Sequence, residues 1–254
     1  MKSGIVKLLH RVFFVVSVLF FFESCCIQKR NTNGGSVLQK RRLYDYSKKN
    51  FELPPYNKDR KLWYKDSLII AELFRIDIEE DNNGHETWKA VIYGYTFIDL
   101  RTKSFYDYTT FSDTARIVDK YTQPDTGRVK GGWNFFDNRP VIYPENLETL
   151  PDTVIENISY KRVKSSRVFK TGQVDENVFQ VGYFRYDKKN SFFFLDKPLS
   201  KQIGYPMVRV DHLTPSRQTW IMTEIEFLPD QLTKEEIKVF DAWQKNAKNN
   251  PVHK

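Results

Sequence analysis

The side chains in this sequence that could form a hydrolytic or metal site are its histidines, serines and carboxylates. Of the four histidines, only His85 and His212 lie away from the two ends of the chain. Neither has a histidine or glutamate at the spacing of a metal ligand pair, and Asp211 would point to the opposite face of a strand from His212. No serine lies in a Gly-x-Ser-x-Gly elbow. The spacing therefore selects no nucleophile, metal or cofactor.

Carboxylate pairs of the kind that glycosidases use leave no mark in a sequence, because the two groups meet only in space. The candidates in or beside predicted strands are Asp99, Asp107, Asp113 and Glu224. We interpret each as a turn or edge residue. The glycine-rich run 127–132 lacks the Gly-Lys-Ser/Thr ending of a phosphate-binding loop, and we interpret it as a hairpin turn.

Aromatic side chains are the most suggestive binding residues, and they make up 15% of the chain. Aromatic surfaces with polar groups bind sugars, peptides and proteins. Alternation places Tyr106 and Tyr108 opposite Phe105, so one side of this strand is expected in the core and the other exposed. Core packing is the alternative for most of them. The candidate binding aromatics are Tyr93, Tyr95, Tyr106, Tyr108 and Trp133.

Composition narrows the class of protein. Hydrophobic residues make up 40% of 254 residues, which is enough for a core, and the Phe, Tyr and β-branched content favours sheet over helix. The formal charge is +8, but lysines and acids are mixed along the chain, so we expect no nucleic-acid partner. The two cysteines, Cys25 and Cys26, are adjacent. Residues 27–254 therefore hold no disulfide framework and no thiolate metal site.

The N-terminus has the pattern of a targeting segment. Three Lys and Arg residues precede residues 12–22, an apolar run that is too short for the roughly 20 residues of a membrane-spanning helix. Ser24 and Cys25 follow it. A small residue before a cysteine at this place resembles the lipobox of bacterial lipoproteins, where signal peptidase II cuts before the cysteine.

This resemblance implies that residues 1–24 are a signal peptide and that Cys25 carries the lipid that attaches the protein to a membrane. Phe22 and Glu23 stand where the lipobox has small aliphatic residues, and Cys26 is the alternative modified residue. Basic rather than acidic residues follow the cysteines, which favours a location facing the periplasm over the cell surface.

The mature chain divides into two parts. Residues 25–60 are predicted as the lipidated cysteine and a flexible tether, because they are polar, rich in Lys and Arg, and end at Pro54 and Pro55. Residues 61–254 are predicted as one antiparallel β domain.

The strongest strand pattern is a meander. Strands are predicted over 68–78 and 87–100, joined by a tight hairpin at Asn83-Gly84, with a third over 105–111. Both sides of 87–100 are largely apolar, so this strand should be covered on both faces. Residues 115–121 fit a short helix or a strand. Further strands are predicted over 158–163, 178–186, 192–195, 207–210 and 219–227.

A helix is predicted over about 233–247. Thr233 and Glu236 fit a capping box, and Leu232 and Ile237 lie at the positions of a hydrophobic staple.

These patterns predict a mainly β fold, an antiparallel sheet that is sandwich-like or a partly closed barrel, with a C-terminal α-helix. The function that fits best is non-enzymatic: a membrane-anchored envelope lipoprotein that binds a protein, glycan or lipid. A glycan hydrolase with a carboxylate pair is the alternative.

Overall fold

The computed structural model describes residues 34–54, 57–122, 147–171, 174–189, 191, 193–214, 218–229 and 231–252. Its strands, in chain order, are β1 (Gly34–Asp45), β2 (Asn50–Glu52), β3 (Arg60–Lys65), β4 (Leu68–Glu80), β5 (Glu86–Asp99), β6 (Ser104–Tyr108), β7 (Ile117–Thr122), β8 (Glu148–Ile155), β9 (Ile158–Thr171), β10 (Val174–Arg185), β11 (Met207–Thr214) and β12 (Thr219–Phe227). The described helices are a short 3₁₀ helix, η1 (Tyr186–Lys188), α2 (Lys197–Ile203) and α3 (Lys234–Asn249).

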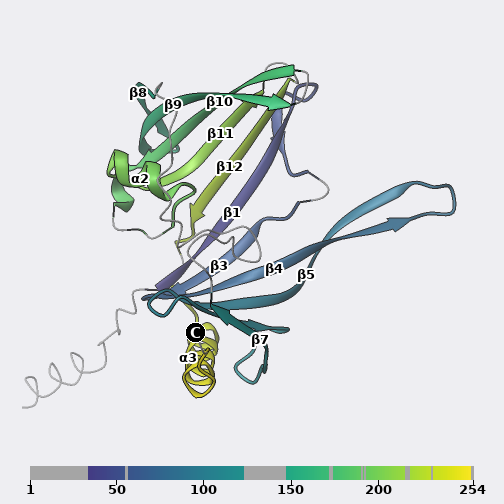
Figure 1. The fold of residues 1–254 in the computed structure, drawn as a ribbon, viewed down its shortest axis with the longest axis vertical. Coiled ribbons are helices and arrows are strands. Elements are labelled where there is room, and N and C mark those ends of the chain that lie inside the picture. Colours follow the sequence, from purple (N-terminus) through teal and green to yellow (C-terminus); the bar gives the residue numbers. More distant parts are fainter. Residues whose placement is uncertain are drawn as a thin grey trace, which may run out of the picture. The chain divides into compact units, whose positions relative to one another are not determined.

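All the described strands belong to one antiparallel sheet (Figure 1). The strand order is β7-β6-β5-β4-β3-β1-β12-β11-β10-β9-β8, and β2 pairs with β1 beside this path. Most neighbours in the sheet are consecutive in sequence, whereas β1 joins strands from the two ends of the chain. The described strands β7 and β8 are the edges, so the sheet does not close into a barrel. The predicted class, mainly antiparallel β with a C-terminal helix, is confirmed.

The flexible tether predicted over 25–60 is wrong for its described part, because β1 lies in the middle of the sheet. Val37 is fully buried between Leu62 of β3 and Phe227 of β12. Several of the basic residues that indicated a linker form ion pairs: Lys40 Nζ lies 2.6 Å from Glu226 Oε2, and Arg42 pairs with Asp59. One neighbour of β1 in the sheet, β12, lies near the far end of the sequence. The sequence of the segment alone therefore does not show that it is a strand. The compact unit accordingly begins at Gly34.

Helix α3 has the predicted start. Thr233 Oγ1 accepts a hydrogen bond from the Glu236 amide at 3.1 Å, and Glu236 Oε2 accepts one from the Thr233 amide at 2.8 Å. The predicted capping box is therefore confirmed. Leu232 is 8% exposed, and Ile237 packs against the same cluster. The buried face of the helix covers β3 to β6, with Phe240 and Trp243 fully buried.

The other main core cluster joins buried residues of nine strands to one loop residue. Its fully buried members include Val37, Ile69, Ile98 and Phe105. Phe193 lies in the loop before α2, and its ring lies 5.3 Å from that of Tyr64 in β3. The strand predicted over 192–195 is wrong, because the described residues 193–195 form a loop that packs on the sheet.

Several other strand predictions agree with the model. The predicted strand over 219–227 has the bounds of β12. Of the two alternatives for 115–121, the strand is correct from Ile117, where β7 begins. Pro151 lies in the edge strand β8, where the register shifts between Leu150 and Thr153. Edge strands and irregular pairing are where a strand tolerates proline, because no ladder hydrogen bond is lost there.

Candidate functional site

The outer part of the β4–β5 hairpin extends past the strands that pair with its base. Among the described strands, β3 pairs with residues 68–71 of β4, and β6 pairs with residues 95–99 of β5. Residues 74–92, here called the arm, therefore pair across β4 and β5 alone. Figure 1 shows both strands continuing past their neighbours.

One face of the arm is apolar from its base as far as the pair Glu80 and Glu86 at its end. The register pairs Phe74 with Ile92, Ile76 with Ala90 and Ile78 with Trp88, and successive pairs on the same face are two residues apart. Ile76, Ile78 and Trp88 are 42%, 54% and 41% exposed. Six apolar side chains thus form one strip on a two-stranded ribbon. The prediction that this strand is covered on both faces holds for Phe97 and Ile98 and is wrong for the arm.

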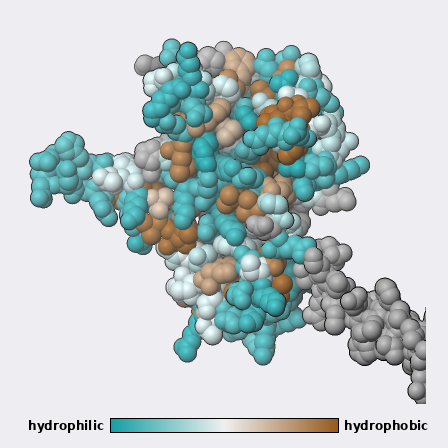
Figure 2. Space-filling view, turned by 180° about the vertical axis from the view of Figure 1, so that it is seen from behind, coloured by the Kyte–Doolittle hydropathy of each residue, from teal (hydrophilic) through white to brown (hydrophobic). Residues whose placement is uncertain are grey.

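The opposite face and the tip of the arm are charged. Arg75, Asp77, Glu79 and Lys89 alternate with the apolar residues, and Arg75 Nε lies 2.7 Å from Asp77 Oδ1. Five acidic and two basic side chains give residues 74–92 a net charge of −3. In Figure 2 the arm is the extension on the left, and the side turned to the viewer is mostly hydrophilic.

The tip of the arm is held by Asp81. Its Oδ1 accepts hydrogen bonds from the amides of Asn83 at 2.8 Å and His85 at 2.9 Å, and these bonds hold the pKa of Asp81 below its usual range. The expected tight two-residue hairpin is instead the five-residue loop 81–85, in which Gly84 alone has a positive φ of 79°. The side chain of Asp81 adds to the backbone bonds of the loop, in which the Asp81 amide donates to the His85 oxygen and the Gly84 amide to the Asp81 oxygen, both at 3.0 Å.

A β-bulge marks the base of the arm. Leu73 pairs with Gly94 and Phe74 with Ile92, so Tyr93 is the extra residue between them and is 47% exposed. A Cβ at Gly94 would lie 2.7 Å from the backbone oxygen of Tyr108, so glycine allows β5 and β6 to approach here. A bulge bends its strand, which is consistent with the arm leaving the sheet at this point.

The other candidate aromatics lie apart from the arm. Tyr106 and Tyr108 are 4% and 1% exposed beneath α3. The expectation that one side of this strand is exposed is wrong, because α3 covers Tyr106 and Tyr108 while the core covers Phe105. Tyr95 is half-buried, with its ring 5.4 Å from Phe111, and burial raises its pKa. Trp133 and Cys25 lie outside the described residues.

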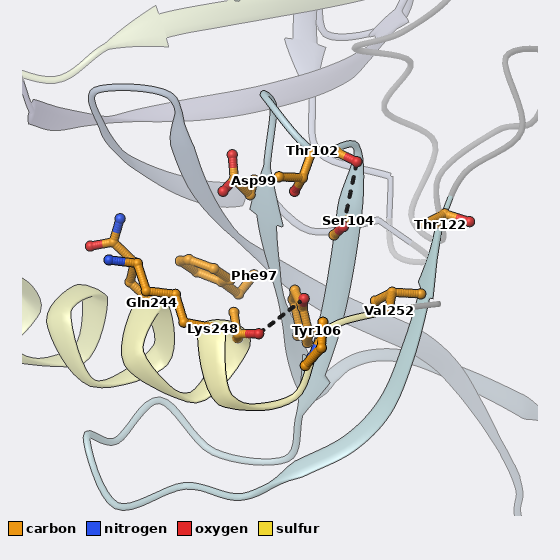
Figure 3. A pocket seen from close by; sticks show the side chains of 11 residues that line it. Phe97, Asp99, Thr102, Ser104, Tyr106, Thr122, Gln244, Lys248 and Val252 are labelled. Atoms are coloured by element: carbon orange, nitrogen blue, oxygen red, sulfur yellow. Dashed lines mark hydrogen bonds between the residues drawn. The ribbon is translucent and has the colours of Figure 1, made fainter. Parts of the chain in front are cut away.

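A cavity of about 260 Å³ lies between the C-terminal half of α3 and strands β5 to β7 (Figure 3). Phe97 and Tyr106 form part of its wall, and the Tyr106 hydroxyl donates to the backbone oxygen of Ala247 at 3.4 Å. Asp99 is its one carboxylate and is bound by Arg101. The volume is below the roughly 300–1,000 Å³ typical of small-molecule sites.

A second cavity, of about 120 Å³, lies under α2 and brings together Ser165, His212 and Asp196. The three do not form a catalytic relay. His212 Nδ1 lies 2.9 Å from the Gln180 amide nitrogen, and Asp196 Oδ1 accepts from the Leu199 amide as the cap of α2. Neither cavity is lined by two carboxylates, so neither has the geometry of a glycosidase pair.

The prediction that Asp211 and His212 point to opposite faces is confirmed. Asp211 accepts from Tyr183 and Arg209, while His212 contacts Gln180. Among the described residues, no three His, Cys, Asp or Glu side chains are close enough to hold a metal ion. In the same part of the chain, no helix combines the length and the apolar character needed to cross a membrane.

The sequence patterns found the strands of the arm but missed its exposed apolar face. Alternation of Ile76 and Ile78 with Arg75 and Asp77 indicates an amphipathic strand, and it does not tell whether the apolar side meets the core. The sequence did hold one signal for exposure: the acidic residues 79–81 and 86 around the hairpin loop make this end of the hairpin too polar to be buried. The positions at which β3 and β6 stop pairing with the hairpin set where the arm begins, and they are visible only in the structure.

A single antiparallel sheet with an exposed apolar arm defines a β protein whose most prominent surface suits binding. No protein-family model matches the chain, and no curated protein sequence matches it. Similar solved structures include the lipoprotein LppX of Mycobacterium tuberculosis and LprF from Mycobacterium bovis. Each covers 80% of this chain and 90% of its own, with TM-scores of 0.35 and identities of 8% and 9%. Likeness at this level says nothing about function, which has to come from the chain's own residues.

Proposed function

We propose that this chain is a lipid-anchored protein of the bacterial cell envelope that binds a protein partner through the apolar face of the arm. The anchor is Cys25, reached through the signal-peptide pattern and the resemblance to a lipobox, and the mature chain faces the periplasm. The binding role rests on one observation: Ile76, Ile78 and Trp88 are exposed on a single strip of the arm. Contiguous exposed apolar strips on a folded domain mark interaction sites.

The chemistry of the arm favours a protein over a glycan or a lipid. Its apolar strip is mostly aliphatic, with Phe74 and Trp88 as its aromatic side chains, whereas sugars need aromatic faces with polar groups beside them. Five acidic side chains surround the strip, and an anionic lipid surface would repel them. A protein surface offers apolar side chains together with basic ones at the rim. Tyr93, exposed at the base of the arm, would extend the contact.

Site-specific photo-crosslinking in cells tests the binding surface. A benzophenone amino acid in place of Ile78 is expected to crosslink to protein, because this side chain lies on the strip. The same group in place of Asp77, on the opposite face of the same strand, is the matched control and should give little product. Equal products from both positions, or lipid adducts from Ile78, would contradict the proposal.

The anchor is tested separately by radiolabelled palmitate. The wild-type protein is expected to incorporate label, and Cys25→Ala to lose it. Cys26→Ala is the control and should retain the label. If Cys25→Ala keeps the label and Cys26→Ala loses it, the anchor is the second cysteine. Absence of label from the wild-type protein would overturn the lipoprotein assignment.

A further inference from the structure

The charges of the chain are unevenly divided between the arm and the rest. Residues 25–254 carry a formal charge of +6 and the arm −3, so the remainder carries +9. The acidic side chains of the arm lie at its tip and on the face opposite the apolar strip, where they would form the rim of a contact. A surface that binds the arm should therefore combine apolar side chains with basic neighbours.

The chain itself has such a surface near the end of β1. We call it the aromatic patch: Tyr44, Tyr46, Phe51, Leu53 and Trp220. The ring of Tyr44 lies 4.9 Å from that of Tyr46, 5.1 Å from Phe51 and 4.9 Å from Trp220. Tyr46 and Leu53 are 52% and 46% exposed.

The patch has basic neighbours, and exposed apolar side chains concentrate on it and on the arm. Residues 41–53 hold four basic and two acidic side chains, a net charge of +2. Lys48 and Lys49 are exposed, and Lys48 Nζ lies 2.8 Å from Glu52 Oε1 in the same segment. Within the described part of the chain, eight large hydrophobic side chains are exposed. Six of these lie on the arm and its base or on the patch: Tyr46, Leu53, Ile76, Ile78, Trp88 and Tyr93.

We infer that the protein partner of the arm is a second copy of this chain, with the arm of one copy docked on the aromatic patch of the other. This inference rests on the proposed function and names its partner. Ile76, Ile78 and Trp88 supply the aliphatic and indole surface, and Tyr46 and Leu53 receive it. Glu79 and Glu80 at the end of the arm meet Lys48 and Lys49 beside the patch.

A twofold axis would make this contact self-limiting. Each copy has one arm and one patch, so two copies related by a twofold axis make the same contact twice and close as a dimer. Lipid anchors on one membrane hold the copies at a high local concentration, which strengthens such an association.

Sedimentation velocity of the full mature chain in detergent tests the inference at micromolar concentrations. The wild-type protein is expected to sediment as a dimer, and Ile78→Asp and Tyr46→Asp are each expected to be monomers, since each removes one half of the contact. Val118→Asp is the control, because Val118 is 60% exposed on β7 and belongs to neither surface. Unchanged circular dichroism melting curves show that the variants are folded.

Charge exchange tests the pairing of the two surfaces. Glu79→Lys with Glu80→Lys should weaken the dimer at least tenfold, and Lys48→Glu with Lys49→Glu should do the same. Combining all four substitutions should restore it, because opposite charges face each other again. Failure of the combination to restore the dimer would overturn the docking of the arm on this patch.

The outcomes separate this inference from the proposed function. A wild-type protein that stays monomeric, while Ile78 crosslinks to a different protein in cells, overturns the self-association and leaves the proposed function standing. A monomer that gives no protein crosslink overturns both. A monomer whose labelled Ile78→Cys, Cys26→Ala variant shows a membrane-dependent fluorescence shift in phosphatidylglycerol vesicles means that a lipid surface covers the arm.

Discussion

Glu236 in α3 accepts a hydrogen bond 2.6 Å long from the indole nitrogen of Trp63 in β3. The same carboxylate lies 3.4 Å from Lys61 Nζ and accepts the amide proton of Thr233 at 2.8 Å. One side chain therefore caps the helix and fixes its start to the sheet. Glu236 is 173 residues from Trp63 and 175 from Lys61 in sequence, so the contact ties the end of the chain to its first half.

This contact makes part of the stability depend on pH. Burial raises the pKa of Glu236, but the hydrogen bonds from Thr233, Trp63 and Lys61 outweigh it, so its pKa lies below the usual range. A carboxyl with a lowered pKa stabilises the fold above the usual glutamate value of about 4.3, and this stability is lost as the pH falls through the folded-state pKa. The Glu236→Gln variant should lose about 1–2 kcal/mol at pH 7.

Urea unfolding at pH 7 and at pH 3 measures the effect. The difference between wild type and Glu236→Gln should shrink at pH 3, where the wild-type carboxyl is protonated. Glu235→Gln is the matched control, because Glu235 is the exposed neighbour in the same turn of α3. A difference that stays constant from pH 7 to pH 3 would show that the charge of Glu236 plays no part.

Glu224 in β12 should show the opposite dependence. Burial raises its pKa, and the nearby Arg209 and Lys40 offset this only in part. A carboxyl with a raised pKa favours the fold below the usual glutamate value, and that contribution is lost as the pH rises through the folded-state pKa. Glu224→Gln is therefore expected to stabilise the protein at pH 7 and to have little effect at pH 3. Thermal unfolding at both pH values checks this, and a destabilised variant at pH 7 would contradict it.

Trp243 is the side chain on which the packing of α3 most depends. It is fully buried, its ring lies 3.8 Å from that of Tyr108 at an angle of 3°, and its indole nitrogen donates to the Ser112 oxygen at 2.8 Å. Trp243→Ala should cost about 3–5 kcal/mol, since it leaves a large cavity. Trp88→Ala on the exposed arm should cost less than about 1 kcal/mol. Equal losses in urea unfolding would show that α3 is not part of the cooperative core.

Local patterns predicted the elements whose signals are complete within a few residues. The capping box at Thr233 and Glu236 gave the start of α3, and the apolar and β-branched residues over 219–227 gave the bounds of β12. Both depend on chemistry between near neighbours in sequence. The same kind of signal existed for α2, where Asp196 and Gly204 stand at the two ends, but the residues between them were not recognised as a helix.

The features that the sequence did not reveal depend on distant partners. β1 is a strand because Leu62 and Phe227 pack on either side of Val37, and its own lysines and arginines indicate a linker. The arm is exposed because neither neighbouring strand reaches it. β3 pairs with β4 only as far as Ala71, and β6 pairs with β5 only from Tyr95 onward. Of the candidate aromatics, Tyr93 is exposed and Tyr106 is buried, although both have the same local alternation.

A substitution of Gly204 at the end of α2 should change the stability of the protein through backbone strain alone. Gly204 caps the helix with a φ of 83°, a left-handed conformation that side chains other than glycine rarely adopt. A Cβ placed on it meets no atom within 4 Å, so a substitution there creates strain without a clash. Gly204→Ala should therefore cost about 1 kcal/mol, and Gly204→Asn less, because asparagine tolerates this conformation better. Urea unfolding measures both, and a variant with alanine as stable as the wild type would mean that the helix ends differently in solution.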